Sequence, residues 1–165
     1  MSYSVIGGAD GPTSIFLAGS TGSDWINILG LVFVALLLIP NIIYALMFRN
    51  QENKCDNKFM NVLEQIGRYA SMFLMVFNIG IAEFGFSSVG VFLLYGFGNA
   101  FLILAYWIVW MLYFHKQDFR KMMALAIVPA CMFVLSGVTR GHILLMVSGV
   151  IFGIGHVYVT YQNAK

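Results

Sequence analysis

The sequence predicts an all-α polytopic membrane protein: a bundle of about five transmembrane helices preceded by a short N-terminal half-helix or re-entrant segment. Of its 165 residues 60% are hydrophobic and 10% are charged, whereas soluble domains carry about 25% charged residues. The mean hydropathy is +0.84. The charged residues gather between long apolar runs. We therefore divide the chain into a Gly/Asp-rich segment, 1–24, and a single transmembrane bundle, 25–165.

Composition argues against several classes of function. The net charge is only +2, so nucleic acid is not an expected partner. Cys55 and Cys131 belong to no metal or redox motif, and the chain lacks a zinc-protease motif, a phosphate loop and a nucleophile–base spacing. Enzymatic activity is therefore the weakest option, and no cofactor is expected apart from a cation. No Lys or Arg precedes Arg49, so we expect the first helix to remain as a signal anchor.

The N-terminal segment holds the densest group of unusual residues. Asp10 lies among Gly7, Gly8 and Gly11, just before Pro12. Pro12 suits the first turn of a helix, and the Asp10 carboxylate could accept the free N–H of Thr13. Residues 12–18 then form a helix about 10–12 Å long, too short to cross a bilayer. Two interpretations stay open: a small hard cation held by oxygen ligands, or an ordinary helix cap.

The run from Gly7 to Phe16, Gly-Gly-Ala-Asp-Gly-Pro-Thr-Ser-Ile-Phe, resembles the Gly/Asp-rich motif of the beta subunit of sodium-ion-translocating decarboxylases. The resemblance implies a re-entrant segment in which Asp10 binds Na⁺, with Gly8, Gly11 and Thr13 around it. It also implies a bacterial origin. It is confined to these residues: the family subunit is much larger, and its other parts are not recognisable in this chain.

The first predicted span covers residues 25–48 and contains Pro40 followed by Asn41, which predicts a kink and freed carbonyl groups. In the polar connection that follows, Phe59, Leu63 and Ile66 recur at helical spacing, and the polar residues lie elsewhere on the helix: Lys58, Asn61, Glu64 and Gln65. We expect an amphipathic helix over Lys58–Ile66, lying on the membrane face and leading into the next span. The same segment could instead be a surface for docking a partner.

The second predicted span, 69–86, contains Asn78 and Glu83, and the third, 89–114, contains Asn99. An acidic group inside a span is expensive unless it faces protein or water, and Glu83 lies near the outer end, where that cost falls. We expect Asn99 to join helices rather than bind a ligand. These three residues are secondary polar candidates for lining a path, and Arg140 is a fourth secondary polar candidate.

The fourth predicted span covers 122–138, with Pro129 in its middle, and the fifth covers 143–161. Gly149 and Gly153 form a small-xxx-small packing face in the fifth. No second His or Cys follows His156 at helical spacing, so hydrogen bonding within the bundle is the better interpretation than metal binding.

The basic residues predict the orientation. With five alternating spans, every Lys and Arg except Arg140 falls on one side, which the positive-inside rule places in the cytoplasm. The N-terminus is then outside and the C-terminus inside. This topology brings Asp10, Glu83 and Arg140 to the outer face, and we expect Glu83 and Arg140 to pair there with Asp10 close by.

Two functions remain open for a protein of the inner or plasma membrane. The first is cation binding or transport through the N-terminal motif. Five spans with few buried polar groups make a poor complete transporter, so a second copy or a membrane partner subunit would help. The alternative is a non-catalytic accessory protein that acts by interaction, with the N-terminal segment as a structural cap. Transport needs that segment buried in the bundle; interaction allows it to lie on the surface.

Overall fold

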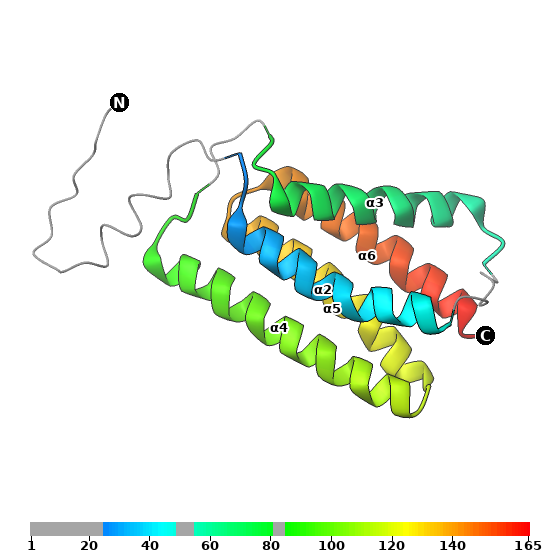
Figure 1. The fold of residues 1–165 in the computed structure, drawn as a ribbon. Helices are drawn as coiled ribbons and strands as arrows, with labels where there is room; N and C mark the ends of the chain where they lie inside the picture. Colours follow the sequence, from blue (N-terminus) through cyan, green and yellow to red (C-terminus); the bar gives the residue numbers. More distant parts are fainter. Residues whose placement is uncertain (1–24, 49–54, 81–84) are drawn as a thin grey trace, which may run out of the picture.

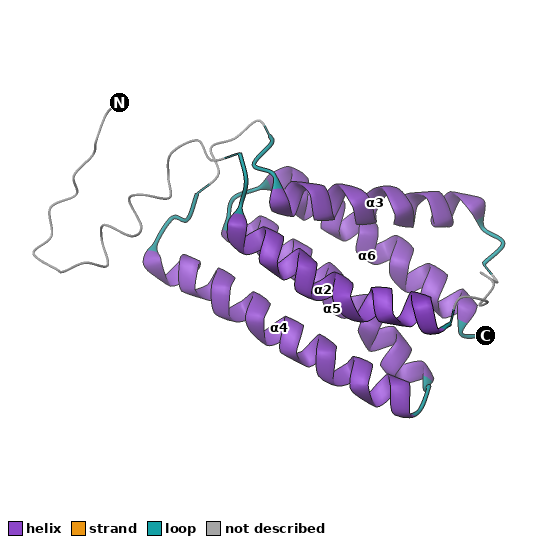
Figure 2. Ribbon diagram, in the orientation of Figure 1, coloured by secondary structure: helices purple, strands orange, loops and turns teal. Residues whose placement is uncertain are grey.

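A computed structural model describes residues 25–48, 55–80 and 85–165. These residues form five α-helices (Figure 1): α2 (Ile28–Met47), α3 (Lys58–Val76), α4 (Val89–His115), α5 (Phe119–Thr139) and α6 (Ile143–Asn163). Within the described part, helices and loops account for everything except one isolated β-bridge (Figure 2). The predicted all-α class is confirmed. Helices α2, α4, α5 and α6 are long and apolar enough to cross a membrane, and they match the predicted first, third, fourth and fifth spans closely.

Successive helices run in opposite directions and lie side by side (Figure 1). We call the end at which α2, α4 and α6 begin the Arg140 end; it is on the left of Figure 1. We call the opposite end, where α3 and α5 begin, the lysine end, because four lysines lie in or beside its helix termini: Lys58, Lys116, Lys121 and Lys165. The described lysines therefore gather at one end, as the sequence predicted.

The second predicted span was wrong in its bounds. One helix, α3, joins the expected surface helix over 58–66 to the first half of the expected span over 69–86. It ends at Val76, and Phe77 is extended (φ −103°, ψ 131°) because it pairs with Ile26 in an antiparallel bridge. Asn78 therefore lies in a connection rather than in a helix, and Arg68 lies inside a helix rather than in a loop.

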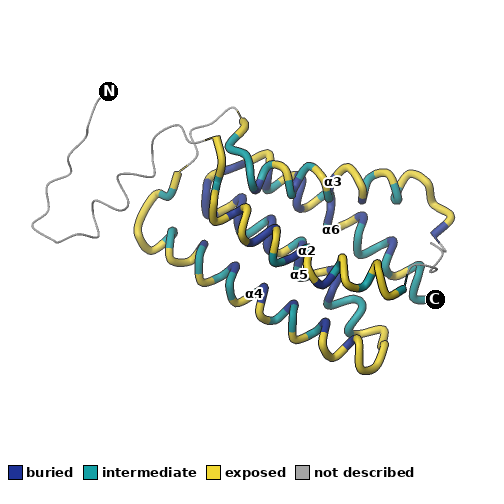
Figure 3. Tube along the Cα trace, in the orientation of Figure 1, coloured by how far each residue is buried: buried dark blue, intermediate teal, exposed yellow. Residues whose placement is uncertain are grey.

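Helix α3 turns its polar and small residues inward, toward α6. Its buried face carries Glu64, Gly67, Ser71 and Met75. A Cβ on Gly67 would lie 2.6 Å from the backbone nitrogen of Phe152, so the two helices approach closely. The outer face of α3 is solvent-exposed in the isolated chain, as Figure 3 shows by colour. It is mainly apolar, because its exposed residues include Phe59, Val62, Ile66, Tyr69 and Phe73 together with the polar Gln65.

The α5–α6 interface is also built on small residues. A Cβ on Gly149 would lie 3.0 Å from Phe133 Cβ, and one on Gly153 would lie 3.0 Å from Ala130 Cβ. The predicted packing face of Gly149 and Gly153 is therefore confirmed. The α5–α6 turn requires a left-handed residue, which Gly141 supplies (φ 65°).

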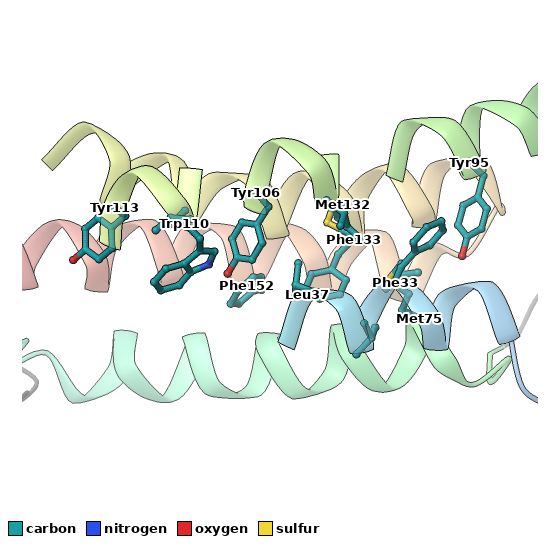
Figure 4. Packing of buried hydrophobic residues seen from close by; sticks show 14 residues of the cluster. Phe33, Leu37, Met75, Tyr95, Tyr106, Trp110, Tyr113, Met132, Phe133 and Phe152 are labelled. Atoms are coloured by element: carbon teal, nitrogen blue, oxygen red, sulfur yellow. The ribbon is translucent and has the colours of Figure 1, made fainter. Parts of the chain in front are cut away.

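Helix α2 is joined to α4 around Pro40. Proline has no N–H, so the carbonyl of Leu36 loses its intrahelical donor; the indole Nε1 of Trp107 donates to it at 3.0 Å. The side-chain amide of Asn41 donates to Leu37 O and to Tyr106 Oη, both at 2.8 Å. The predicted freed carbonyl is thus present, and a second helix satisfies it. Aromatic side chains of α4, among them Tyr95, Tyr106 and Trp110, fill the space between the helices (Figure 4).

Candidate functional site

A polar network lies at the Arg140 end, where the chain enters α2. The backbone N–H of Asn78 donates to Trp25 O at 3.0 Å, and that of Asn27 donates to Val76 O at 2.7 Å. The Asn27 side chain also donates to Tyr95 Oη at 2.9 Å. These bonds hold Trp25 and Asn27, which directly follow the N-terminal segment in the chain, beside Val76 and Asn78.

Arg140 lies at the centre of this network. Its side chain comes from the C-cap of α5 and is only 6% exposed. Nη2 donates to Asn78 Oδ1 at 2.7 Å, whereas Nε and Nη1 are buried without an acceptor among the described residues. Burial lowers the pKa of Arg140, and the neighbouring Tyr95 partly opposes this. A buried guanidinium with two open donors attracts an anionic group.

His142, the N-cap of α6, lies at the same end of the bundle. It is fully buried, and its Nδ1 accepts the backbone N–H of Leu145 at 3.2 Å, as an N-cap residue does. Burial lowers the pKa of His142, and the charge of Arg140 lowers it further to a smaller extent. A backbone hydrogen bond partly opposes this shift. The imidazole is therefore held neutral at an end of the bundle that already carries a buried positive charge.

The eight predicted site residues divide into three groups: five that lie outside the described residues, two that lie together, and Asn99. Asp10, Gly8, Gly11, Thr13 and Glu83 lie outside the described residues. Asn78 and Arg140 are brought together, as described above.

Asn99 lies apart from that pair, inside the bundle. It donates to Tyr95 O at 2.8 Å and accepts from Ser136 Oγ at 3.2 Å. It therefore links α4 to α5, and its side chain is fully buried.

A second polar cluster, which the sequence did not predict as a unit, lies where α3 meets α6. Glu64 is 4% exposed, and its Oε1 accepts from Arg68 Nη2 and lies 2.8 Å from His156 Nδ1. The His156 ring stacks on Phe152 at 4.9 Å. His156 is thus hydrogen-bonded within the bundle, as expected. Glu64 was expected on a water-facing side, and only its spacing from Gly67 and Ser71 could have indicated a buried face.

The same interface continues with a buried hydroxyl pair, because Ser71 Oγ donates to Ser148 Oγ at 3.1 Å. Neither polar cluster has the composition of a metal centre: residues 25–48, 55–80 and 85–165 contain no group of three or more His, Cys, Asp or Glu side chains that could hold an ion. The chemistry available in the described part is ion pairing and hydrogen bonding at the two clusters.

No protein-family model matches the chain, and no similar curated protein or solved structure was found.

Proposed function

We propose that the protein is a multi-pass protein of the inner or plasma membrane that binds Na⁺ at the Arg140 end through its N-terminal motif. Asp10 supplies the charge, and Gly8, Gly11 and Thr13 supply further oxygen ligands. Binding of this kind is a step in transport, and a second copy or a partner subunit would complete a path. The main support is the position of Trp25, the residue that follows the N-terminal segment. It is hydrogen-bonded to Asn78, and Asn27 is hydrogen-bonded to Val76.

We further propose that the chain crosses the membrane five times, that α3 crosses in addition to α2, α4, α5 and α6, and that the lysine end lies in the cytoplasm. The support is the inverted pattern of α3: its apolar face points away from the bundle, and its buried face holds Glu64 and Ser71. A helix at the surface of a soluble bundle shows the opposite arrangement. An apolar face that points away from the bundle is favourable when it contacts lipid. The lysines at one end of the bundle support a cytoplasmic position for that end by the positive-inside rule.

Electrostatics sets a condition on this function. An uncompensated Arg140 about 5 Å from a bound Na⁺ would repel it by about 3 kcal/mol at an effective dielectric constant near 20, which is more than a hundredfold in affinity. A Na⁺ site at this end therefore needs a carboxylate that neutralises Arg140. Glu83, which precedes Gly85 by two residues, is the partner we propose; the Gly85 N–H donates to Arg140 O at 3.4 Å.

The alternative function also rests on Arg140. If Asp10 itself occupies the open Nε and Nη1 donors, the N-terminal segment is a cap that completes the bundle. The protein is then a non-catalytic accessory protein that acts through its surfaces. One carboxylate cannot fully serve both Arg140 and a cation, so the two functions make different predictions for Asp10.

The experiment that separates them is ²²Na⁺ binding and uptake in proteoliposomes. Wild type is compared with Asp10→Asn and with Asp24→Asn, which removes a carboxylate of the same segment outside the motif. Cation binding predicts saturable binding that is lost in Asp10→Asn, weakened in Glu83→Gln and kept in Asp24→Asn. No sodium binding by folded wild-type protein would overturn the proposal.

Thermal unfolding tests the alternative on the same variants. A bound cation raises the melting temperature with its concentration, so the cation function predicts that NaCl stabilises wild type more than choline chloride does, and that Asp10→Asn removes the difference. A cap predicts that Asp10→Asn lowers the melting temperature in both salts. It also predicts that the loss is non-additive with Arg140→Gln, as expected for two groups in contact.

A further inference from the structure

An apolar groove of about 260 Å³ runs between α2 and α4. Pro40 and Ile43 line it on α2, and Trp107, Trp110 and Phe114 line it on α4. The volume exceeds the roughly 150 Å³ that suffices to hold a benzene-sized apolar ligand in a protein interior. None of the residues that line the groove belongs to the polar network at the Arg140 end.

Aromatic contacts fix the shape of the groove. Trp107 is held by its hydrogen bond to Leu36 O. Trp110 stacks on Phe114 with ring centroids 5.1 Å apart, and Tyr44 contacts Trp110 at the same distance. Side chains fixed in this way lose little conformational freedom when a ligand binds. A flexible apolar chain therefore finds a preformed recess here, rather than the level surface of an ordinary lipid-facing helix.

Positive charge lies at the lysine end of the groove. Phe114, which lines the groove, is two residues before Lys116, the C-cap of α4. Lys121 Nζ donates to Leu112 O at 3.0 Å and to Lys116 O at 2.9 Å, which holds this ammonium at the last turn of α4 with one of its three N–H donors left over. Arg120 adds a third cation, against one acidic residue, Asp118.

From this arrangement we propose that the groove binds one anionic glycerophospholipid. An acyl chain lies between α2 and α4 against Trp107, Trp110 and Phe114, and the phosphate lies against Lys116 and Lys121. The apolar groove selects a lipid rather than a free anion, and the two ammonium groups select an anionic headgroup over a zwitterionic one. Each lysine near a membrane surface adds about fivefold to the affinity for anionic lipid.

Tryptophan quenching by brominated lipid tests this site directly in proteoliposomes of phosphatidylcholine. The chain has three tryptophans, and Trp25→Phe removes the one at the Arg140 end, leaving Trp107 and Trp110. We expect quenching by brominated phosphatidylglycerol to saturate at a low mole fraction. Quenching by brominated phosphatidylcholine should rise in proportion to its mole fraction. Coinciding curves for the two lipids would overturn the proposal.

Three variants in the Trp25→Phe background identify the site. Lys116→Gln keeps both Lys121 bonds, because they go to the backbone carbonyls of residues 112 and 116, and should raise the half-quenching fraction about fivefold. Ile43→Phe fills the groove at a half-exposed position and should remove the saturable component. Lys58→Gln removes a lysine from the same end but from α3, and should leave the curve unchanged. An effect of Lys58→Gln equal to that of Lys116→Gln would show a general attraction of the lysine end, and would refute the groove site.

Discussion

The indole nitrogen of Trp107 donates to the carbonyl oxygen of Leu36, 71 residues earlier in the chain, at 3.0 Å. That carbonyl is available because residue 40 is a proline within α2. The bond therefore joins two helices through a group that a regular helix would have used internally. It also holds one wall of the groove between α2 and α4.

Trp107→Phe should destabilise the protein by about 1–3 kcal/mol, because the Leu36 carbonyl is left without a donor in an apolar environment. Pro40→Ala restores an N–H at residue 40 that can donate to Leu36 O. We therefore expect Trp107→Phe to cost less in the Pro40→Ala background. Unfolding in mixed detergent micelles, followed by circular dichroism, measures both differences. Equal costs in the two backgrounds would show that the Trp107 bond does not depend on Pro40.

Gly155→Ala should destabilise the α3–α6 contact by about 1–3 kcal/mol. Its Cβ would lie 2.9 Å from the backbone of Glu64, so the helices must separate. Gly96→Ala is the matched control, because a Cβ there meets nothing within 4 Å. The control should be neutral or up to about 1 kcal/mol more stable, since alanine favours the helix. Equal effects of the two substitutions on thermal unfolding would contradict the close approach of α3 and α6.

Local patterns in the sequence predicted the features that depend on neighbouring residues. The freed carbonyl before Pro40, the packing face of Gly149 and Gly153 and four of the helices are of this kind. Each is set by a proline, by a glycine spacing or by a long apolar run, whose structural effect acts within a few turns.

The partners in the bonds between distant residues were not predicted, and for a physical reason. Glu64 was assigned to a water-facing side because polar faces of helices usually point to water. In α3 the preference is reversed, since Glu64 meets His156 across the α3–α6 interface, 92 residues later in the chain. The end of α3 at Val76 depends on the pairing of Phe77 with Ile26, which no local pattern around residue 77 indicates.

Stability should fall as the pH is lowered below about 6.5, through His142. The pKa of His142 is lowered in the folded protein from its ordinary value of 6.5. The unfolded chain therefore binds a proton first, and the contribution of His142 is present above pH 6.5 and lost as the pH falls toward the folded pKa. The slope reaches at most about 1.4 kcal/mol per pH unit. Chemical unfolding between pH 7.5 and 5.5 measures it.

His142→Asn is the control for this pH dependence. An asparagine at the N-cap can still accept the Leu145 N–H, so helix α6 keeps its cap while the titrating group is removed. We expect the dependence of unfolding free energy on pH below 6.5 to be shallower in this variant, in which His115 and His156 are both retained. A slope equal to that of wild type would assign the pH dependence to another group.

Cysteine labelling should show whether α3 crosses the membrane. In a Cys55→Ser, Cys131→Ser background, single cysteines at Ile66 and Phe73, on the apolar face of α3, should resist a water-soluble maleimide. A cysteine at Asn57, just before α3, should react from the cytoplasmic side, and one at Ser87 from the outside. Rapid reaction at both Ile66 and Phe73 from one side would place α3 on the membrane surface.

The inward polar face of α3 has a consequence for the order in which the chain assembles during synthesis. Glu64 and Ser71 have partners on α6, His156 and Ser148, which emerge from the ribosome only after α4 and α5. In a nascent chain that ends before residue 143, the Glu64 carboxylate is paired only with Arg68 on α3 itself; a helix that carries this ion pair without its partner on α6 partitions poorly into lipid. In the proposed five-crossing topology, stable insertion of α3 therefore waits for α6, and a chain truncated after α5 should expose α3 to quality-control proteases.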